Sequence, residues 1–234
     1  METLIRRPED IIRLTQKWGF LPFFKNEIPG FSIEEHTPED LWFSREQDGP
    51  WEWKGPVIES LSVAYGKFFR RKAGFVSLDL LGDFLRLRRR LYPVKEGSLE
   101  AHLLEVLSAH ESLLSREWKS LSGFSFSADR HFASPLEHMA DPSVNQSSRL
   151  KAAFEQAVAG LEMGVHVVTA TFEYKMDGKG QPYGWGVARY CKPELLYGFF
   201  EEGREREEKL LGALLERPLS FFPGYVSQIS RLIG

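Results

Sequence analysis

The chain has 234 residues, of which 42% are hydrophobic and 27% are charged, and this balance is typical of a folded globular protein. That length fits one large domain or two small ones. The net charge of −3 excludes a generally basic coat for nucleic acid, so any binding of a polyanion must come from a local patch.

Several site types and compartments are excluded by the residue types present. The one cysteine, Cys191, excludes an intramolecular disulfide framework and fits a reducing cytoplasm. The six histidines are not clustered at metal-ligand spacing, and we expect no metal and no other cofactor. The start of the chain lacks the apolar core of a signal peptide, and no apolar run is long enough to span a membrane. We therefore expect a cytoplasmic protein with no membrane contact.

The chain begins with a predicted helix and a proline-rich stretch. A run that opens at Pro8 carries apolar residues at helical spacing and ends at Gly19. Residues 20–53 are punctuated by prolines, which predicts loops and short extended pieces.

A hairpin and a long helix are predicted next. Tyr65–Phe69 and Ala73–Ser77 are expected to be strands joined across Arg70-Arg71-Lys72, although this turn lacks the usual Asn-Gly pair. Residues 78–92 have the apolar spacing of a helix, and arginines crowd its end, where positive charge suits the helix dipole. We expect most of these arginines to be solvated and only some to contact a ligand.

Three helices and a second hairpin are predicted after a boundary near residues 93–97. In chain order they are a helix from Ser98, a shorter helix over Arg116–Leu121, a long helix over Gln146–Met163, and strands over Val165–Tyr174 and Tyr183–Tyr190. The Asp-Gly-Lys-Gly sequence at 177–180 is a strong hairpin turn. Three helices followed by a two-stranded wing are an elaboration of the helix-turn-helix, and the third helix of that motif normally enters a DNA groove.

Residues 48–77 combine aromatic rings, glycines and fixed positive charge. Aromatic faces interleaved with cations suit a surface that contacts phosphates and stacks on bases. The alternative interpretation is a buried aromatic hairpin with a solvated basic turn, which composition alone favours.

Several strings of this chain resemble one known family. They are Gly19-Phe-Leu-Pro-Phe-Phe-Lys-Asn-Glu-Ile-Pro-Gly-Phe-Ser32, Trp51-Glu-Trp-Lys54, Tyr65-Gly-Lys-Phe-Phe69, Lys72-Ala-Gly-Phe-Val-Ser77, Lys179-Gly180, Tyr183-Gly-Trp-Gly-Val-Ala-Arg-Tyr190 and Lys192-Pro-Glu194. Over roughly residues 5 to 200 the chain resembles the short bacterial proteins described as AlkZ-related. AlkZ-like DNA glycosylases are tandem winged helices that remove alkylated or crosslinked bases, so the resemblance implies this fold, association with duplex DNA and a possible role in repair.

The catalytic motif of the family is where this sequence departs from it. AlkZ-type glycosylases position water with a Gln-x-Gln or Gln-x-Asp pair, whereas the corresponding segment here reads Phe24-Lys25-Asn26-Glu27. Asn26 and Glu27 are the candidate catalytic residues by position, but neighbouring side chains of an extended segment point to opposite faces. We therefore expect hydrolysis to be altered or lost.

The sequence as a whole predicts a DNA-associated α+β protein, mainly helical, with winged-helix elements and short β-hairpins. Its expected parts are residues 1–94, a winged-helix domain over 97–192, and C-terminal helices over 193–234 that pack on the core or form a homodimer contact. The expected phosphate contacts are Lys67, Arg70, Arg71, Lys72 and Arg89, and the expected cleft aromatics are Trp51, Trp53, Tyr65 and Trp185. Two alternatives remain open, namely a non-enzymatic interaction or transcription-linked protein and a binder of a planar small molecule.

Overall fold

The computed structural model describes residues 4–42, 48–124, 142–176, 178, 182–198, 200 and 203–234. Helices dominate, and the strands form two small antiparallel sheets, which confirms the mainly helical α+β class. None of the helices in these ranges is long and apolar enough to cross a membrane.

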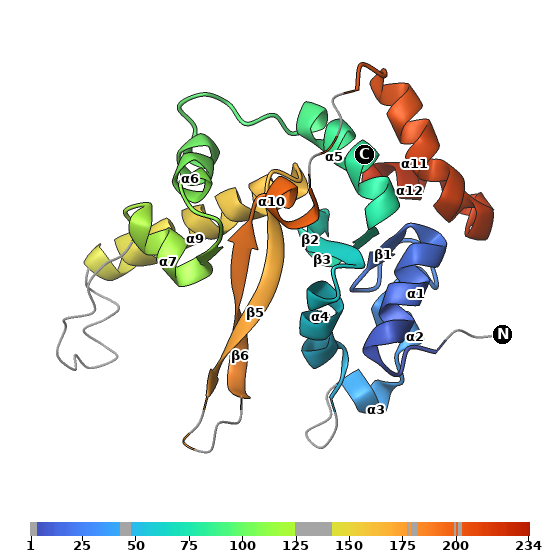
Figure 1. Ribbon diagram of the computed structural model, residues 1–234, viewed down its shortest axis with the longest axis horizontal. Helices are drawn as coiled ribbons and strands as arrows, with labels where there is room; N and C mark the ends of the chain where they lie inside the picture. Colours follow the sequence, from blue (N-terminus) through green and yellow to red (C-terminus); the bar gives the residue numbers. More distant parts are fainter. Residues whose placement is uncertain are drawn as a thin grey trace.

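The first sheet and its helices come from the N-terminal part of the chain (Figure 1). The elements are α1 (Pro8–Trp18), β1 (Phe20–Pro22), α2 (Ile33–His36), α3 (Glu39–Trp42), α4 (Pro50–Glu59), β2 (Val63–Phe69) and β3 (Lys72–Ser77). The long helix α5 (Leu78–Leu91) follows directly. In the sheet the strand order is β1-β3-β2, so the short strand β1 pairs with the second strand of the hairpin.

The second sheet repeats this plan. Its elements are α6 (Leu99–Ser108), β4 (Leu113–Leu114), α7 (Ser115–Leu121), α9 (Pro142–Met163), β5 (Val168–Met176) and β6 (Pro182–Cys191). The strand order is β4-β6-β5, and the short strand again pairs with the second strand of the hairpin. Both units therefore read helix, short strand, short helical segment, helix and hairpin.

Four C-terminal elements cover the first unit. They are α10 (Pro193–Tyr197), α11 (Glu207–Phe221), the 3-10 helix η1 (Pro223–Tyr225) and α12 (Val226–Ile233). Helix α11 packs against α5 and α1, and α12 packs against β2. Figure 1 shows both helices on the side of the molecule opposite α6 and α7.

Residues 20–53 were expected to be loops and short extended pieces, and this was wrong in part, since the short helices α2 and α3 and the first turn of α4 lie there. Pro50 occupies the first helical position, where the missing N–H costs nothing. The Glu52 carboxylate accepts a hydrogen bond from the Gly49 N–H at 3.0 Å and so caps the helix start. In this context the proline marks the beginning of a helix.

The β2–β3 turn has the backbone of a tight hairpin without the usual residues. Phe69 pairs with Lys72, so only Arg70 and Arg71 lie in the turn. Their φ angles are 51° and 62°, which is the left-handed pattern of a type I′ turn that Asn-Gly normally supplies. Both arginines therefore hold a backbone conformation that side chains disfavour.

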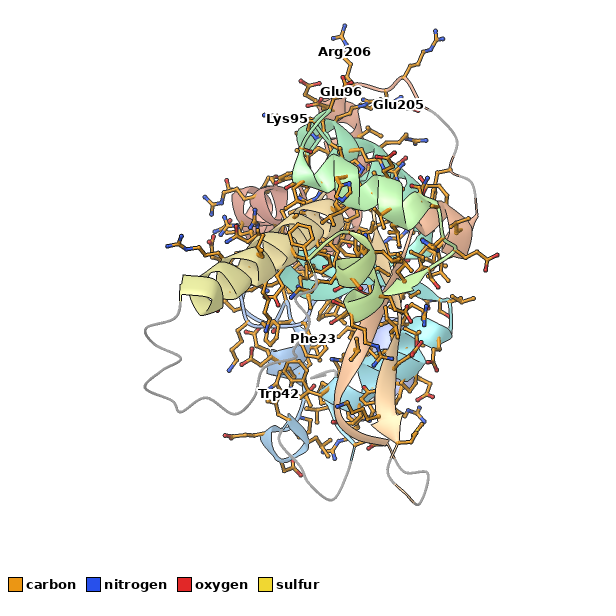
Figure 2. The ribbon with its side chains drawn as sticks, turned by 90° about the vertical axis from the view of Figure 1, so that its left-hand side faces the viewer. Phe23, Trp42, Lys95, Glu96, Glu205 and Arg206 are labelled. Atoms are coloured by element: carbon orange, nitrogen blue, oxygen red, sulfur yellow. The ribbon has the colours of Figure 1, made fainter. Side chains whose placement is uncertain are left out.

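Aromatic contacts fill both hydrophobic cores. In the first unit Phe20 and Phe68 meet the Phe84 ring edge-on, with centroids 5.3 and 5.6 Å away. In the second unit Trp118 is fully buried, and its Nε1–H donates to the Leu103 carbonyl at 2.9 Å. Figure 2 shows another aromatic contact of the first unit, between Phe23 and Trp42, far from the charged loop residues Lys95, Glu96, Glu205 and Arg206.

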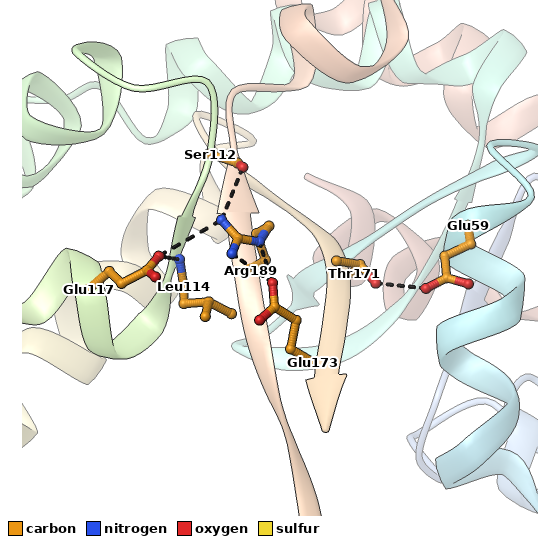
Figure 3. Close-up of polar contacts among 7 residues, drawn as sticks. All are labelled: Glu59, Ser112, Leu114, Glu117, Thr171, Glu173 and Arg189. Atoms are coloured by element: carbon orange, nitrogen blue, oxygen red, sulfur yellow. Dashed lines mark hydrogen bonds and ion pairs between the residues drawn. The ribbon is translucent and has the colours of Figure 1, made fainter. Parts of the chain in front are cut away.

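The hairpin of the second unit is tied to its surroundings by polar contacts (Figure 3). The Arg189 guanidinium on β6 binds the Glu173 carboxylate of β5 at 2.6 Å and donates to the Ser112 hydroxyl at 3.3 Å. On the other side of the hairpin, the Thr171 hydroxyl donates to the Glu59 carboxylate of α4 at 2.8 Å. The contact of Thr171 with Glu59 thus joins the hairpin of the second unit to α4 of the first unit.

Arg88 of α5 is fully buried and joins four segments that are distant in the sequence. Its Nε–H donates to the Met163 carbonyl at 2.8 Å, and its Nη1 donates to the Gly234 carbonyl at 2.8 Å. Its Nη2 donates to the Phe68 carbonyl of β2. Burial lowers the pKa of Arg88 to about 10, which leaves the guanidinium charged at neutral pH. The arginines of α5 were expected to be mostly solvated, and for Arg88 that expectation was wrong.

Glu162 is a second buried ionisable group, and it lies where α9 meets the first unit. Its Oε1 accepts from the Lys67 N–H and from the Thr169 hydroxyl, both at 3.3 Å. Its Oε2 has no hydrogen-bond partner among the described residues. Burial raises the pKa of Glu162 from 4.5 to about 7, because a charged carboxylate is poorly solvated there.

We predict that Arg88→Met lowers the free energy of unfolding by at least about 2 kcal/mol, because several buried carbonyls lose their donor together. Arg90→Met is the control, since Arg90 is exposed and should cost less than about 1 kcal/mol. Urea unfolding followed by tryptophan fluorescence measures both. Equal losses in the two variants would contradict the role given to Arg88.

We also predict that Glu162 makes a contribution to stability that is lost as the pH rises from 5 to 8. The folded protein binds the Glu162 proton more tightly than the unfolded chain, so this stabilisation is complete below about pH 4.5 and disappears as the pH rises through 7. The difference should be on the order of 1–3 kcal/mol and should shrink in Glu162→Gln. Glu155 is exposed on the same helix, so Glu155→Gln should leave the difference in stability between pH 5 and pH 8 unchanged. Urea midpoints at the two pH values decide the matter.

Candidate functional site

A cavity of about 270 Å³ lies beside the β2–β3 turn. Its walls are formed by the segment after β1, by the hairpin turn and by α12. The lining residues are Pro22, Phe24, Asn26, Glu27, Ile28, Phe69, Arg70, Lys72, Ala73, Gln228 and Leu232. We call it the hairpin cavity. It brings together four of the residues that the sequence singled out, namely Asn26, Glu27, Arg70 and Lys72.

Asn26 uses its amide to shape the loop that carries it. Its Oδ1 accepts from the Ile28 N–H at 2.9 Å, and its Nδ2 donates to the Phe31 carbonyl at 2.8 Å. An asparagine that binds the backbone two residues on is typical of a turn. The amide is therefore engaged within the loop, while the residue still lines the hairpin cavity.

Glu27 is held between two arginines that are far apart in the sequence. Its Oε1 lies 2.8 Å from Arg70 Nη1, and its Oε2 lies 2.8 Å from Arg231 Nη2 on α12. The hydrogen bond from Arg70 and the two positive charges lower the pKa of the Glu27 carboxyl. A carboxylate whose pKa is lowered is a weaker base, so this pairing disfavours the removal of a proton from water.

The remaining cations of the turn point to the surface. Arg71 and Lys72 are exposed, and Lys72 also lines the hairpin cavity. The Arg71 backbone N–H donates to the Met163 sulfur at 3.1 Å, which ties the turn to the end of α9. Lys67 lies further along β2 and is half-buried. Three consecutive basic residues thus lie at one tip of the first unit.

Arg89 is engaged elsewhere in the fold. Its Nη1 lies 2.6 Å from a Glu194 oxygen on α10, and its Nη2 donates to the Val165 carbonyl at 3.2 Å. Arg89 is not among the residues that line the hairpin cavity. Arg89 therefore does not belong to the hairpin cavity.

The four aromatics expected in a cleft have different environments. Trp53 and Tyr65 are each 7% exposed and belong to the first core, so neither presents a free face for stacking. Trp51 is half-buried, with its ring 5.2 Å from Phe23 between centroids. Trp185 lies in β6, but its side chain is outside the described residues.

Sequence reasoning missed three residues of this site. Phe24 was taken only as part of a family string, yet its half-buried ring lines the cavity. Gln228 and Arg231 come from α12, about 200 positions along the chain from Glu27. Gln228 lines the cavity, and Arg231 binds Glu27. Their spacing of three residues on a helix was the available signal that they share a face.

The fold and this cavity define a mainly helical α+β protein in which a unit is repeated and the first copy carries a basic turn beside a cavity. A family model described as AlkZ related matches residues 5–224. The chain therefore belongs to the AlkZ-related family, as its sequence strings indicated. No curated protein and no solved structure matches the chain.

Proposed function

We propose that this AlkZ-related protein associates with duplex DNA through the β2–β3 turn. The observation that carries the proposal is the run Arg70-Arg71-Lys72, which places three cations at an exposed hairpin tip next to a cavity. The chain as a whole has a net charge of −3, so a local patch of this kind is what phosphate binding would need. Membership of a family related to DNA glycosylases supports the same conclusion.

We further propose that both units are winged helices. The support is the repeated strand order, in which a short strand after the first helix pairs with the far strand of a hairpin. In this proposal residues 1–94 and 97–192 are the two modules, and residues 193–234 pack on the first of them. The β2–β3 and β5–β6 hairpins are then the two wings.

The first hairpin is the better candidate for contact with phosphates. On the second hairpin, Arg189 is already bound to the carboxylates of Glu173 and Glu117, at 2.6 and 3.8 Å. On the first hairpin, Arg70 shares one carboxylate with Arg231 and is about half exposed. Cations at an exposed tip can exchange a solvated partner for phosphate at little cost.

Hydrolysis of the glycosidic bond is a separate matter, and we propose that Asn26 and Glu27 do not supply it. The Asn26 amide binds its own loop, and the Glu27 carboxylate binds two guanidinium groups. Water activation by a carboxylate requires a free lone pair and a basicity suited to the proton transfer. The protein then acts as a DNA-binding relative of the enzymes.

One observation favours a second candidate function, the binding of a planar small molecule. The hairpin cavity has an apolar part formed by Phe24, Phe69 and Leu232, and a polar mouth formed by charged residues. Sites for small molecules commonly combine an apolar lining with a few orienting polar groups. DNA remains our first proposal because the exposed Arg71, which does not line the cavity, extends the positive charge beyond it.

The DNA proposal predicts that removal of the turn cations weakens binding and flattens its salt dependence. We suggest Arg70→Asn, Arg71→Gly and Lys72→Gln together, because Asn-Gly fits the left-handed turn and keeps the fold. The slope of log affinity against log salt should fall by about 2 to 3 units, one for each lost phosphate contact. Fluorescence anisotropy with a labelled duplex measures the slope.

The matched control removes the same number of positive charges from the segment that leads into α11 and from its first turn. Arg204, Arg206 and Lys209 are exposed there, and their change to Gln should leave the salt slope nearly unaltered. An unchanged slope in the folded turn variant would sink the proposal. If both triple variants lowered the salt slope equally, the loss would reflect net charge in general and would not support contact of the turn with phosphate.

The proposal on hydrolysis predicts little or no release of alkylated bases from duplex DNA. Wild type and Glu27→Gln should then give the same rate, because the carboxylate is not used as a base. Release can be measured by chromatography of the free base after incubation with alkylated DNA. A rate that falls by about 10²–10⁴-fold in Glu27→Gln would establish Glu27 as a base and overturn this part of the proposal.

A further inference from the structure

Glu27 occupies the mouth of the hairpin cavity with both of its oxygens bound. Each oxygen accepts from a different guanidinium, Arg70 on one side and Arg231 on the other, and both distances are 2.8 Å. All three side chains are about half exposed, at 51 to 56% of their surface. The ion pairs are thus open to solvent, and an incoming anion can compete for the two arginines.

The three partners are brought together by segments with no sequence proximity. Arg70 belongs to the turn of the first hairpin, Glu27 to the loop after β1, and Arg231 to α12. Arg231 lies outside residues 5–224, the part of the chain that matches the family. The second guanidinium is therefore a contribution of this chain's own C-terminal helix.

A phosphate offers the same kind of acceptor atoms as the carboxylate. Guanidinium groups bind both anions through charge-assisted hydrogen bonds, and a phosphate carries more acceptor oxygens. Arg70 and Arg231 both bind the Glu27 carboxylate, and Lys72 is a further cation that lines the same cavity. Once Glu27 moves away into water, the two guanidinium groups can face a single anion.

The cavity behind the mouth has room for a ring. Phe24 and Phe69 contribute aromatic surface, and Gln228 contributes an amide that can donate and accept hydrogen bonds. Its volume of about 270 Å³ is slightly below the range of about 300–1,000 Å³ that holds drug-sized ligands. A single ring system attached to a phosphate matches this combination of size and chemistry.

We propose that Arg70 and Arg231 form a phosphate-binding site at the mouth of the hairpin cavity, and that Glu27 occupies this site until a nucleotide phosphate displaces it. The nucleotide's ring then lies against Phe24 and Phe69. The phosphate can belong to a DNA strand or to a free nucleotide. In the first case the inference rests on the proposed association with DNA, and in the second it does not.

The test compares Glu27→Gln and Arg231→Gln with wild type, using the full chain. The probes are deoxyadenosine monophosphate, deoxyadenosine and a labelled duplex, and binding is measured by calorimetry and by anisotropy. Glu111→Gln and Arg116→Gln are the matched controls, since both residues are exposed in the second unit. Thermal melts establish that each variant is folded.

We expect Glu27→Gln to bind at least one phosphate-bearing probe about three- to tenfold more tightly, since the competing charge is gone. Arg231→Gln should bind the same probe several-fold more weakly, and deoxyadenosine should respond to neither change. A response with the monophosphate assigns the site to free nucleotides, and a response with the duplex alone assigns it to DNA.

The inference is overturned if Glu27→Gln binds neither phosphate-bearing probe more tightly than wild type, or if Arg231→Gln leaves the affinity unchanged. It is also overturned if the two control variants reproduce the effects. A different result separates this site from the DNA proposal. If the triple variant of the turn leaves the salt slope of duplex binding unchanged, while Glu27→Gln still binds the monophosphate more tightly, the DNA proposal is contradicted and this site is supported.

Discussion

The arrangement of the first unit depends on the hydrogen bonds that the buried guanidinium of Arg88 donates. It donates to backbone carbonyls of β2, of the end of α9 and of the end of α12, and these segments lie between 20 and 146 positions away. A charged donor in a protein interior is costly unless it is fully hydrogen-bonded. Because the four carbonyl partners are backbone groups, Arg88 constrains the paths of these segments as well as their side chains.

The hairpin cavity follows from this constraint. Its lining includes Phe69 and Arg70, directly after the Phe68 carbonyl that Arg88 binds, and Leu232, directly before the Ile233 carbonyl that it also binds. The Met163 sulfur that accepts from Arg88 also accepts from the Arg71 N–H in the turn. The buried Arg88 thus fixes the backbone of the β2–β3 turn and of α12 relative to each other. These two segments carry the exposed Arg70 and Arg231.

Local patterns predicted the regular elements well, because helices and hairpins are determined by nearby residues. The apolar periodicity of α1, α5 and α9 and the two hairpins are confirmed, while α4 was missed because Pro50 was read as a break. The burial of Arg88 and Trp53 depends on partners far along the chain, which local patterns do not contain. For the same reason Glu27 and Arg70 were predicted separately, and neither their direct ion pair nor the second ion pair of Glu27 with Arg231 was foreseen.

A crystal structure of the protein with a short DNA duplex tests the central claim most directly, namely that the basic turn and the mouth of the hairpin cavity bind phosphate. The account predicts phosphate oxygens within hydrogen-bonding distance of the Arg70 and Arg231 guanidinium groups, and Glu27 turned away from both. A duplex bound on another face, with Glu27 still held between the two arginines as it is here, would contradict it.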